Sequence, residues 1–136
     1  MKKIFIAGGA GYIGSVLIKH FLSKGFKIKC FDALIYSQKD CISKFSENKN
    51  FQFILGDIRN YEKVKNSLND VSIVVILAGL VGDFITKKYP KEADEINNKA
   101  IKNIINSCKN RNIDRLIFVS TCSNYGLLKN NEIADE

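Results

Sequence analysis

The sequence is poor in the residues that build metal sites. It has one histidine, His20, and its four cysteines include no pair separated by two residues: Cys30, Cys41, Cys108 and Cys122. A structural zinc site needs four Cys or His ligands at short spacings, so we expect no metal site. We expect the cysteines to be reduced, partly buried thiols.

Long apolar runs are also missing. No stretch approaches the roughly 20 apolar residues that a membrane-spanning helix requires. The N-terminus does not read as a signal peptide either, because the apolar stretch after Met1, Lys2 and Lys3 is interrupted by Gly8 and Gly9. We therefore expect a cytoplasmic protein that has no membrane partner.

Positive charge is in excess but is not clustered. The chain has 21 Lys and Arg against 14 Asp and Glu, a formal net charge of +7, with no long block of one sign. A nucleic-acid surface requires clustered cations interleaved with exposed aromatic residues. We expect solvated lysines and no nucleic-acid partner, and a mild attraction for phosphorylated substrates stays open.

Short apolar runs recur along the 136 residues, a length that suits one domain. Five of them are rich in Ile, Val and Phe and have the length of buried strands: Lys2–Ala7, Lys27–Phe31, Phe51–Leu55, Ser72–Leu77 and Arg115–Ser120. Their alternation with helical patterns predicts an α/β fold, a Rossmann doubly wound parallel sheet in three α/β/α layers. We expect about five strands in the order 3-2-1-4-5.

The predicted helices span Tyr12–Lys24, Asn60–Leu68 and Glu92–Arg111, and Pro90 suits the start of the last one. The apolar stripe expected along the first is Ile13, Val16, Leu17, Phe21 and Leu22. The stripe expected along the last is Ile96, Ala100, Ile101, Ile104, Ile105 and Cys108. Residues 36–50 are polar and weakly periodic, which predicts a short helix or a loop.

A glycine-rich turn joins the first strand to the first helix. The pattern GxGxxG is met by Gly9, Gly11 and Gly14, and GxxGxxG is met by Gly8, Gly11 and Gly14. The early glycine allows the tight turn, Gly11 allows the backbone to approach a pyrophosphate, and Gly14 allows close packing of helix on strand. The helix N-terminus offers free N–H groups to phosphates, so the turn predicts a dinucleotide site.

Asp32 ends the second strand at the distance from the glycines expected of a carboxylate that binds the adenosine ribose hydroxyls. The four residues from Asp32 to Ile35 include no Lys or Arg that would receive a 2′-phosphate. NAD is therefore favoured over NADP as the cofactor.

Later segments carry a family resemblance. They are Gly56-Asp57-Ile58-Arg59 after the third strand, Leu77-Ala78-Gly79 after the fourth, Asn97 on the long helix, and the segment Val119–Gly126 after the fifth. With the glycine loop, they make the chain similar to the extended short-chain dehydrogenases/reductases of the NAD-dependent epimerase/dehydratase family. Most members act on nucleotide sugars. The resemblance covers the first half of a typical member, and Ala100 and Ile101 depart from the Gly-Thr usual after Asn97.

The resemblance implies a role for each matching residue. Asp57 and Ile58 would contact adenine, and Leu77, Ala78 and Gly79 would form a backbone wall beside the cofactor. The full set of implied cofactor contacts is Gly8, Gly11, Tyr12, Ile13, Gly14, Asp32, Asp57, Ile58, Leu77, Ala78, Gly79, Asn97 and Ser120.

Thr121 would be the catalytic hydroxyl that bonds the reacting sugar group, with Ser123 as a second candidate. Simpler interpretations stay open for two of these segments. Asp57 would also serve as a helix cap, and Ser or Thr after a strand is ordinary turn chemistry.

The family also uses a tyrosine with a lysine four residues later, whose charge lowers the pKa of the tyrosine. That pair is expected past residue 136. The matches Tyr61…Lys65 and Tyr125…Lys129 are attributed to chance, the second because Gly126 disfavours a helix. We expect residues 1–136 to form one NAD-binding domain, cut before the YxxxK helix and the substrate lobe. The apolar face left uncovered would favour a homo-oligomer.

The leading hypothesis is the cofactor-binding domain of a nucleotide-sugar epimerase or dehydratase, an oxidoreductase or isomerase that passes a hydride between a sugar carbon and NAD. Alone, the chain would bind NAD without turnover. One alternative is a non-catalytic module or subunit that binds or senses NAD(H). The other is a small reductase that uses Tyr125 and Lys129.

Overall fold

Five parallel strands form one sheet in the computed structural model, which describes residues 2–121. The strands are β1 (Lys3–Ala7), β2 (Lys27–Asp32), β3 (Phe51–Leu55), β4 (Ile73–Ile76) and β5 (Arg115–Phe118). Their order is β3-β2-β1-β4-β5, so the predicted fold and strand order are confirmed. Consecutive parallel strands need crossover connections, which is why helices alternate with strands along the chain.

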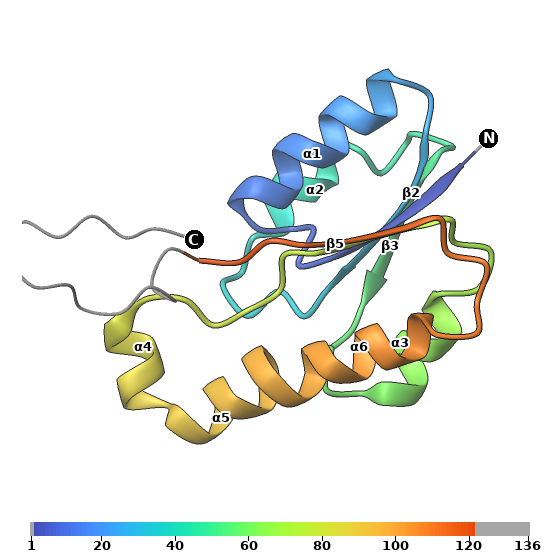
Figure 1. Ribbon diagram of the computed structural model, residues 1–136. Helices are drawn as coiled ribbons and strands as arrows, with labels where there is room; N and C mark the ends of the chain where they lie inside the picture. The colour runs from blue at the N-terminus through green and yellow to red at the C-terminus, as the bar shows by residue number, and fades with distance from the viewer. Residues whose placement is uncertain (1, 122–136) are drawn as a thin grey trace, which may run out of the picture.

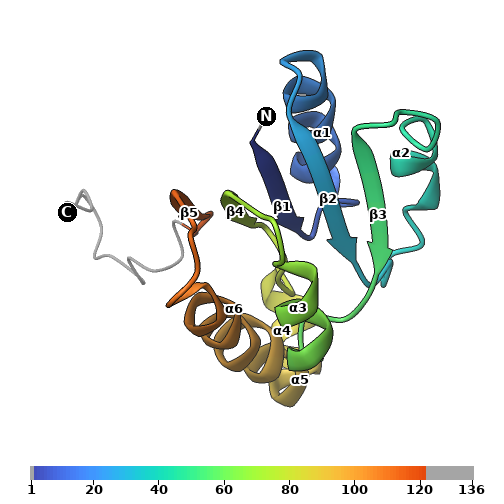
Figure 2. The same cartoon turned by 90° about the vertical axis from the view of Figure 1, so that its right-hand side faces the viewer.

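The crossover helices lie on both faces of the sheet (Figure 1). On one face are α1 (Tyr12–Ser23) and α2 (Lys39–Ser43), and on the other are α3 (Tyr61–Ser67) and the long helical segment that precedes β5. The view along the sheet in Figure 2 separates these layers clearly. The segment 36–50, predicted to be a short helix or a loop, contains the five-residue helix α2 and loops around it.

The core has two parts, one on each face of the sheet. Alternate residues of β1 enter them in turn: Ile4 and Ile6 pack under α1, whereas Phe5 and Ala7 pack under the long helix. All four are fully buried. Because the central strands are covered on both faces, they read as continuous apolar runs in the sequence.

The predicted apolar stripe of α1 is wrong in part. Ile13 is 52% exposed and Val16 is 61% exposed, whereas Gly14 and Ile18 are the buried residues of this helix. Gly14 packs against the backbone of the glycine turn, and this contact fixes the rotation of the helix about its axis. The neighbouring stripe through Ile18 therefore faces the sheet.

The long helical segment begins at Pro90, as the proline predicts, and runs through α5 (Pro90–Asp94), a π-helical turn (Glu95–Ala100) and α6 (Ile101–Cys108). The predicted inner face is confirmed at four buried residues, which are Ile96, Ala100, Ile101 and Ile104. Cys108, which is partly buried, packs against the same core. Ile105 is 36% exposed, so its assignment to that face is wrong. The short helix α4 (Asp83–Lys88) was not predicted, because its six residues are too few to show a helical period.

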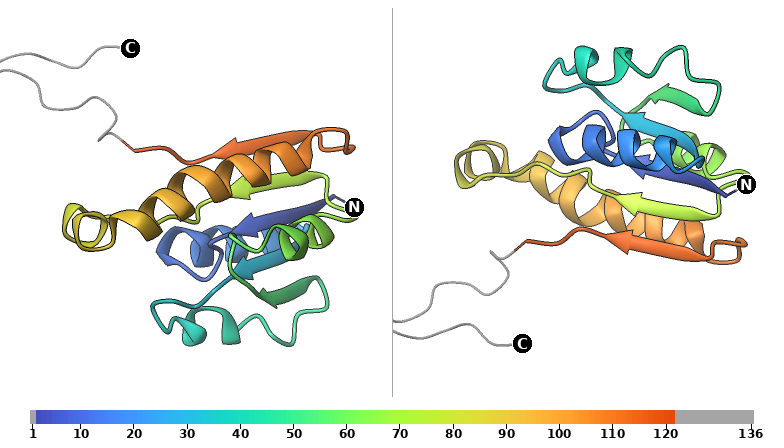
Figure 3. Two further views of the ribbon diagram at one scale, coloured as in Figure 1. Left: turned by 90° about the horizontal axis from the view of Figure 1, so that it is seen from below. Right: turned by 90° about the horizontal axis from the view of Figure 1, so that it is seen from above.

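One face of the sheet is uncovered over β4 and β5. Figure 3 (right) shows α1 and α2 above β1, β2 and β3, with no helix of residues 2–121 above the other two strands. Ile117 lies beside Val75 in the register of β4 and β5, so its side chain lies on the same face as Val75, which packs with the core under α1. Ile117 is 40% exposed there. Within residues 2–121, no helix combines the length and apolar character needed to span a membrane.

Candidate functional site

The turn after β1 brings three backbone segments into contact. Gly8 has a φ of +80°, a conformation that costs L side chains energy. A Cβ at Gly8 would lie 2.6 Å from the backbone nitrogen of Ala78, which follows β4. The N–H of Gly8 donates to the carbonyl of Phe31 in β2 at 2.8 Å, so the turn is fixed between the ends of two strands.

Gly14 sets how closely α1 approaches that turn. A Cβ on Gly14 would lie 2.5 Å from the carbonyl oxygen of Gly9 and 2.7 Å from that of Gly8. Backbone cannot move aside as a flexible side chain can, so only glycine fits. Gly11 differs, because a Cβ there would meet only the Gly8 oxygen, at 3.3 Å, and its φ of −68° suits any residue.

The N-terminus of α1 opens toward the turn. Gly11 is its N-cap and supplies no side chain to the first turn, which also contains no acidic residue. The first N–H groups of a helix have no carbonyl partner within it and carry the positive end of the helix dipole. This end of α1 is therefore suited to an anionic group.

Asp32 stands at the carboxyl end of β2, beside the glycine turn. Its Oδ2 accepts the N–H of Ala10 at 2.9 Å, and its Oδ1 accepts the N–H of Leu34 at 2.8 Å. The two bonds fix the carboxylate between the glycine turn and the loop after β2. Each oxygen has a second lone pair, so the carboxylate can still accept hydroxyl donors from a ligand.

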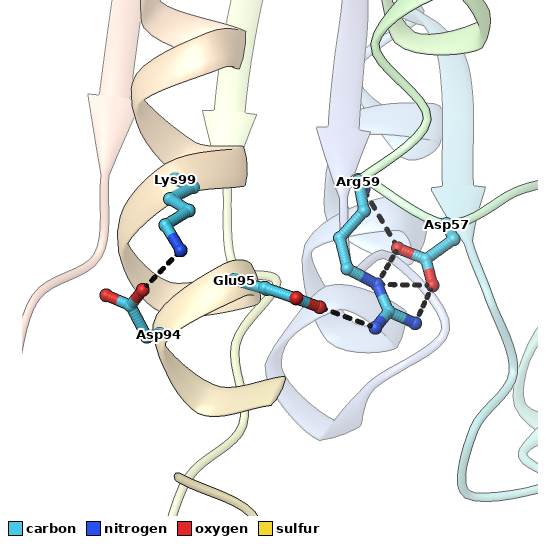
Figure 4. A network of polar contacts seen from close by, with 5 residues as sticks. All are labelled: Asp57, Arg59, Asp94, Glu95 and Lys99. Carbon is cyan, nitrogen blue, oxygen red and sulfur yellow. Dashed lines mark hydrogen bonds and ion pairs between the residues drawn. The ribbon is translucent and has the colours of Figure 1, made fainter. Parts of the chain in front are cut away.

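Asp57 follows β3 and is held by Arg59. The guanidinium of Arg59 donates to both carboxylate oxygens of Asp57, with 3.0 Å between Nε and Oδ2, and it also pairs with Glu95 of the π turn (Figure 4). The hydrogen bond from the Arg59 side chain lowers the pKa of Asp57. The alternative that Asp57 caps the next helix is wrong, because Asn60 caps α3 by accepting the N–H of Lys63 at 3.0 Å.

The carboxyl ends of β1, β2, β3 and β4 enclose an open groove with a volume of about 120 Å³. It brings together eight of the residues predicted to contact a cofactor: Gly8, Gly11, Asp32, Asp57, Ile58, Leu77, Ala78 and Gly79. Sequence reasoning missed other lining residues, among them Ile35, Tyr36, Leu80 and Ile96. Ile35 and Tyr36 follow Asp32 directly, and their apolar character in a loop was the available signal.

A second hollow, with a volume of about 520 Å³, shares the wall from Leu77 to Leu80 with the groove. Asn97, Ser120 and Thr121 line it, together with Phe118 and residues of α4. The two hollows lie on either side of the wall formed after β4. This is where the order of the sheet reverses between β1 and β4, the usual place of ligands in open α/β sheets.

The side-chain amide of Asn97 is bonded to one residue of that wall. Its Oδ1 accepts the N–H of Leu80 and its Nδ2 donates to the carbonyl of Leu80, both at 2.8 Å. Asn97 therefore ties the long helix to the loop after β4. Its predicted contact with a cofactor stays a prediction.

Other predicted residues lie apart from the groove. Tyr12 is 86% exposed and stands with Ile13 in the first turn of α1, outside the groove lining. Lys65 lies over the ring of Tyr61 at 5.8 Å on the surface of α3, and neither residue lines either hollow. Ser123 and the Tyr125…Lys129 pair lie outside the described residues, as does Cys122.

Three free thiols, those of Cys30, Cys41 and Cys108, occur in residues 2–121. Cys30 is fully buried below Gly9, and burial raises the pKa of its thiol to about 12. Such a thiol stays protonated and unreactive at neutral pH. Across residues 2–121, no group of three or more His, Cys, Asp or Glu is placed to hold a metal ion.

Comparison with known proteins gives one family. A model described as the 3-beta hydroxysteroid dehydrogenase/isomerase family matches residues 5–136. A UDP-glucose 4-epimerase of Rickettsia rickettsii is 27% identical over 125 residues, which cover 88% of this chain and 36% of that protein. A UDP-glucose 4-epimerase of Klebsiella pneumoniae is 30% identical over 130 residues, which cover 91% of this chain and 92% of that sequence.

Comparison with solved structures also finds epimerases. A UDP-glucuronic acid 4-epimerase of Bacillus cereus, in complex with UDP-glucuronic acid and NAD, has a TM-score of 0.87 at 28% identity, over 98% of this chain and 44% of that one. A UDP-Glc/GlcNAc 4-epimerase of Campylobacter jejuni has a TM-score of 0.85 at 29% identity, over 93% of this chain and 39% of that one. The chain thus spans only about a third of the length of the first curated relatives that it matches.

The two kinds of glycine contact predict different responses to alanine. Gly14→Ala would force a Cβ into the backbone of Gly8 and Gly9, and we expect it to lower the free energy of unfolding by about 2–3 kcal/mol. Gly11→Ala places its Cβ against one backbone atom only, the carbonyl oxygen of Gly8 at 3.3 Å, and should cost about 1 kcal/mol or less, mainly because alanine is a weaker N-cap. Urea unfolding followed by circular dichroism measures both, and equal losses would contradict the assignment of Gly14.

Proposed function

The chain belongs to the 3-beta hydroxysteroid dehydrogenase/isomerase family, among the extended short-chain dehydrogenases/reductases of the NAD-dependent epimerase/dehydratase type, and we propose that residues 1–136 form the NAD-binding domain of a nucleotide-sugar epimerase. One observation carries the proposal. The carboxylate of Asp32 and the glycine turn line the same groove, at the carboxyl ends of adjacent strands. The epimerases to which the chain is similar support the nucleotide-sugar class of substrate.

The groove suits the adenosine half of NAD. The N-terminus of α1, whose N-cap Gly11 carries no side chain, would receive the pyrophosphate. Asp32 keeps lone pairs that would accept the hydroxyls of the adenosine ribose. Asp57 and Ile58 would border the adenine ring, and Ile58, only 7% exposed, adds an apolar surface at that end.

The second hollow suits the nicotinamide half. The wall from Leu77 to Gly79 separates the two hollows, so a dinucleotide would cross it with one half on each side. Asn97, Ser120 and Thr121 line the far side. When bound, NAD supplies a hydride acceptor, and the hydroxyl of Thr121 would hold the reacting hydroxyl or carbonyl of the sugar.

The groove favours NAD over NADP. Beside Asp32 it is lined by Ala33, Ile35, Tyr36 and Gln38, none of which is cationic. A 2′-phosphate would stand next to the Asp32 carboxylate without a compensating positive charge, and like charges at this separation repel. Within residues 1–136, Thr121 would be the one catalytic group, without the Tyr and Lys that move the proton. We therefore propose binding of NAD without turnover by this chain alone.

Calorimetric titration of the chain with NAD and NADP tests the proposal. We expect NAD to bind and NADP to bind at least tenfold more weakly, because the carboxylate of Asp32 repels the 2′-phosphate. Asp32→Asn should weaken the binding of NAD and reduce the difference in affinity between NAD and NADP. The control Asp40→Asn removes an exposed carboxylate outside the groove lining and should leave both affinities unchanged. Folded protein that binds neither cofactor would refute the proposal.

We also propose that the chain forms homo-oligomers through the uncovered face over β4 and β5, where Ile117 is 40% exposed. Sedimentation at high concentration should then show species larger than 15.3 kDa. Ile117→Lys should shift the population toward monomer, because a charge would be buried at the contact. Asn106→Lys adds the same charge at an exposed position of α6 and should change nothing. A wild-type chain that stays monomeric throughout would disprove this proposal.

A further inference from the structure

Consecutive residues of the π turn reach different walls of the groove. Glu95 pairs with Arg59 of the loop after β3, Ile96 lines the groove, and Asn97 bonds to Leu80 of the loop after β4. Figure 4 shows Glu95 reaching from the long helix toward the guanidinium of Arg59. The turn therefore stands between the loops that border the two hollows.

The adenine-side contact runs through Arg59. Its NH1 lies 3.4 Å from Oε2 of Glu95, while its Nε and its other terminal nitrogen bond to the carboxylate of Asp57. Arg59 is thus held from both sides, and it fixes the direction of the Asp57 carboxylate at the edge of the groove. Asp57 and Glu95 come from elements 38 residues apart, so the contact is a tertiary one.

The contact between Asn97 and the wall after β4 is shorter than the contact between Glu95 and Arg59. Both polar atoms of the Asn97 amide bond to the backbone of Leu80 at 2.8 Å, in the manner of a paired strand. The neighbouring Gly79 leaves no room for a side chain without crowding, since a Cβ there would lie 3.2 Å from Oδ1 of Asn97. The position of this wall therefore follows the position of Asn97.

An ion pair supports the π geometry of the turn. Lys99 lies 2.8 Å from Asp94, and these residues are five apart. Side chains meet at spacings of three and four on an α-helix, whereas the π-helix joins residues five apart through its hydrogen bonds. Asn98 also donates to Asp94, at 3.0 Å. Asp94, the residue just before the π turn, is thus bonded on the outer surface to two residues within the turn.

We propose that the π turn Glu95–Ala100 is a positioning element that holds two walls of the cofactor site separately. Glu95 holds the adenine-side wall through Arg59, and Asn97 holds the wall after β4, which the two hollows share, through Leu80. This inference rests on the proposed function, since it assigns a role to residues that support the NAD groove. Glu95 is a positioning residue, because it acts through Arg59 and Asp57. The two sides should respond to different substitutions.

The test compares AMP, which reaches only the adenine side, with NAD, which spans both. Glu95→Gln should weaken the binding of AMP and the binding of NAD by the same factor, about threefold, as expected for loss of a half-exposed ion pair. Asn97→Ala should weaken NAD binding about tenfold and AMP binding less, because two hydrogen bonds to the shared wall are lost, and NAD would cross this wall whereas AMP would contact only its near side. Glu92→Gln is the matched control, an exposed glutamate of the same helical segment with no ion pair among residues 2–121, and should titrate as wild type.

Thermal unfolding of each variant separates positioning from general damage. A variant that merely loosens the fold would weaken AMP and NAD alike, so an Asn97→Ala variant with equal losses would overturn the inference. Unchanged affinities of Glu95→Gln for AMP and NAD would overturn the inference as well. The proposed function would still stand in that case, provided that the wild-type chain binds NAD. A wild-type chain that binds neither ligand would overturn both.

Discussion

The contact between backbone and backbone at the glycine turn is the constraint on which the rest of the structure depends. Gly8 meets the start of the wall after β4, and Gly14 meets the carbonyls of Gly8 and Gly9. No side chain separates the first helix from the sheet at this point, so the helix N-terminus lies directly above the ends of the central strands. The groove, the rotation of α1 and the placement of Asp32 beside the turn all follow from this close approach.

The groove combines one fixed anion with one positive helix end. The carboxylate of Asp32 is oriented by two backbone N–H groups, and the N-terminus of α1 contains no acid that would neutralise it. A ligand that brings hydroxyls to the carboxylate and phosphates to the helix would satisfy both. On the adenine side, the guanidinium of Arg59 pairs with the carboxylate of Asp57, so this cation is not available to a further phosphate.

The strands and their order were predictable, because buried parallel strands read as short apolar runs and crossover rules restrict their arrangement. The rotation of α1 was not, since stripes through Ile13 and Val16 or through Gly14 are both apolar in part, and only the backbone contact at Gly14 decides between them. The π turn was also missed. The spacing of Asp94 and Lys99 by five residues is a signal in the sequence, but it gains meaning only once the helix is known.

The central claim is that a dinucleotide binds across the carboxyl ends of β1, β2, β3 and β4, and a ¹⁵N-resolved NMR titration with NAD tests it most directly. The amide signals of Gly8, Gly11, Asp32, Asp57 and Ala78 should shift together and saturate at one stoichiometry. Shifts confined to the hollow at the opposite ends of the strands, lined by residues 68–72, 111 and 112, would contradict the claim, as would a spectrum that NAD leaves unchanged.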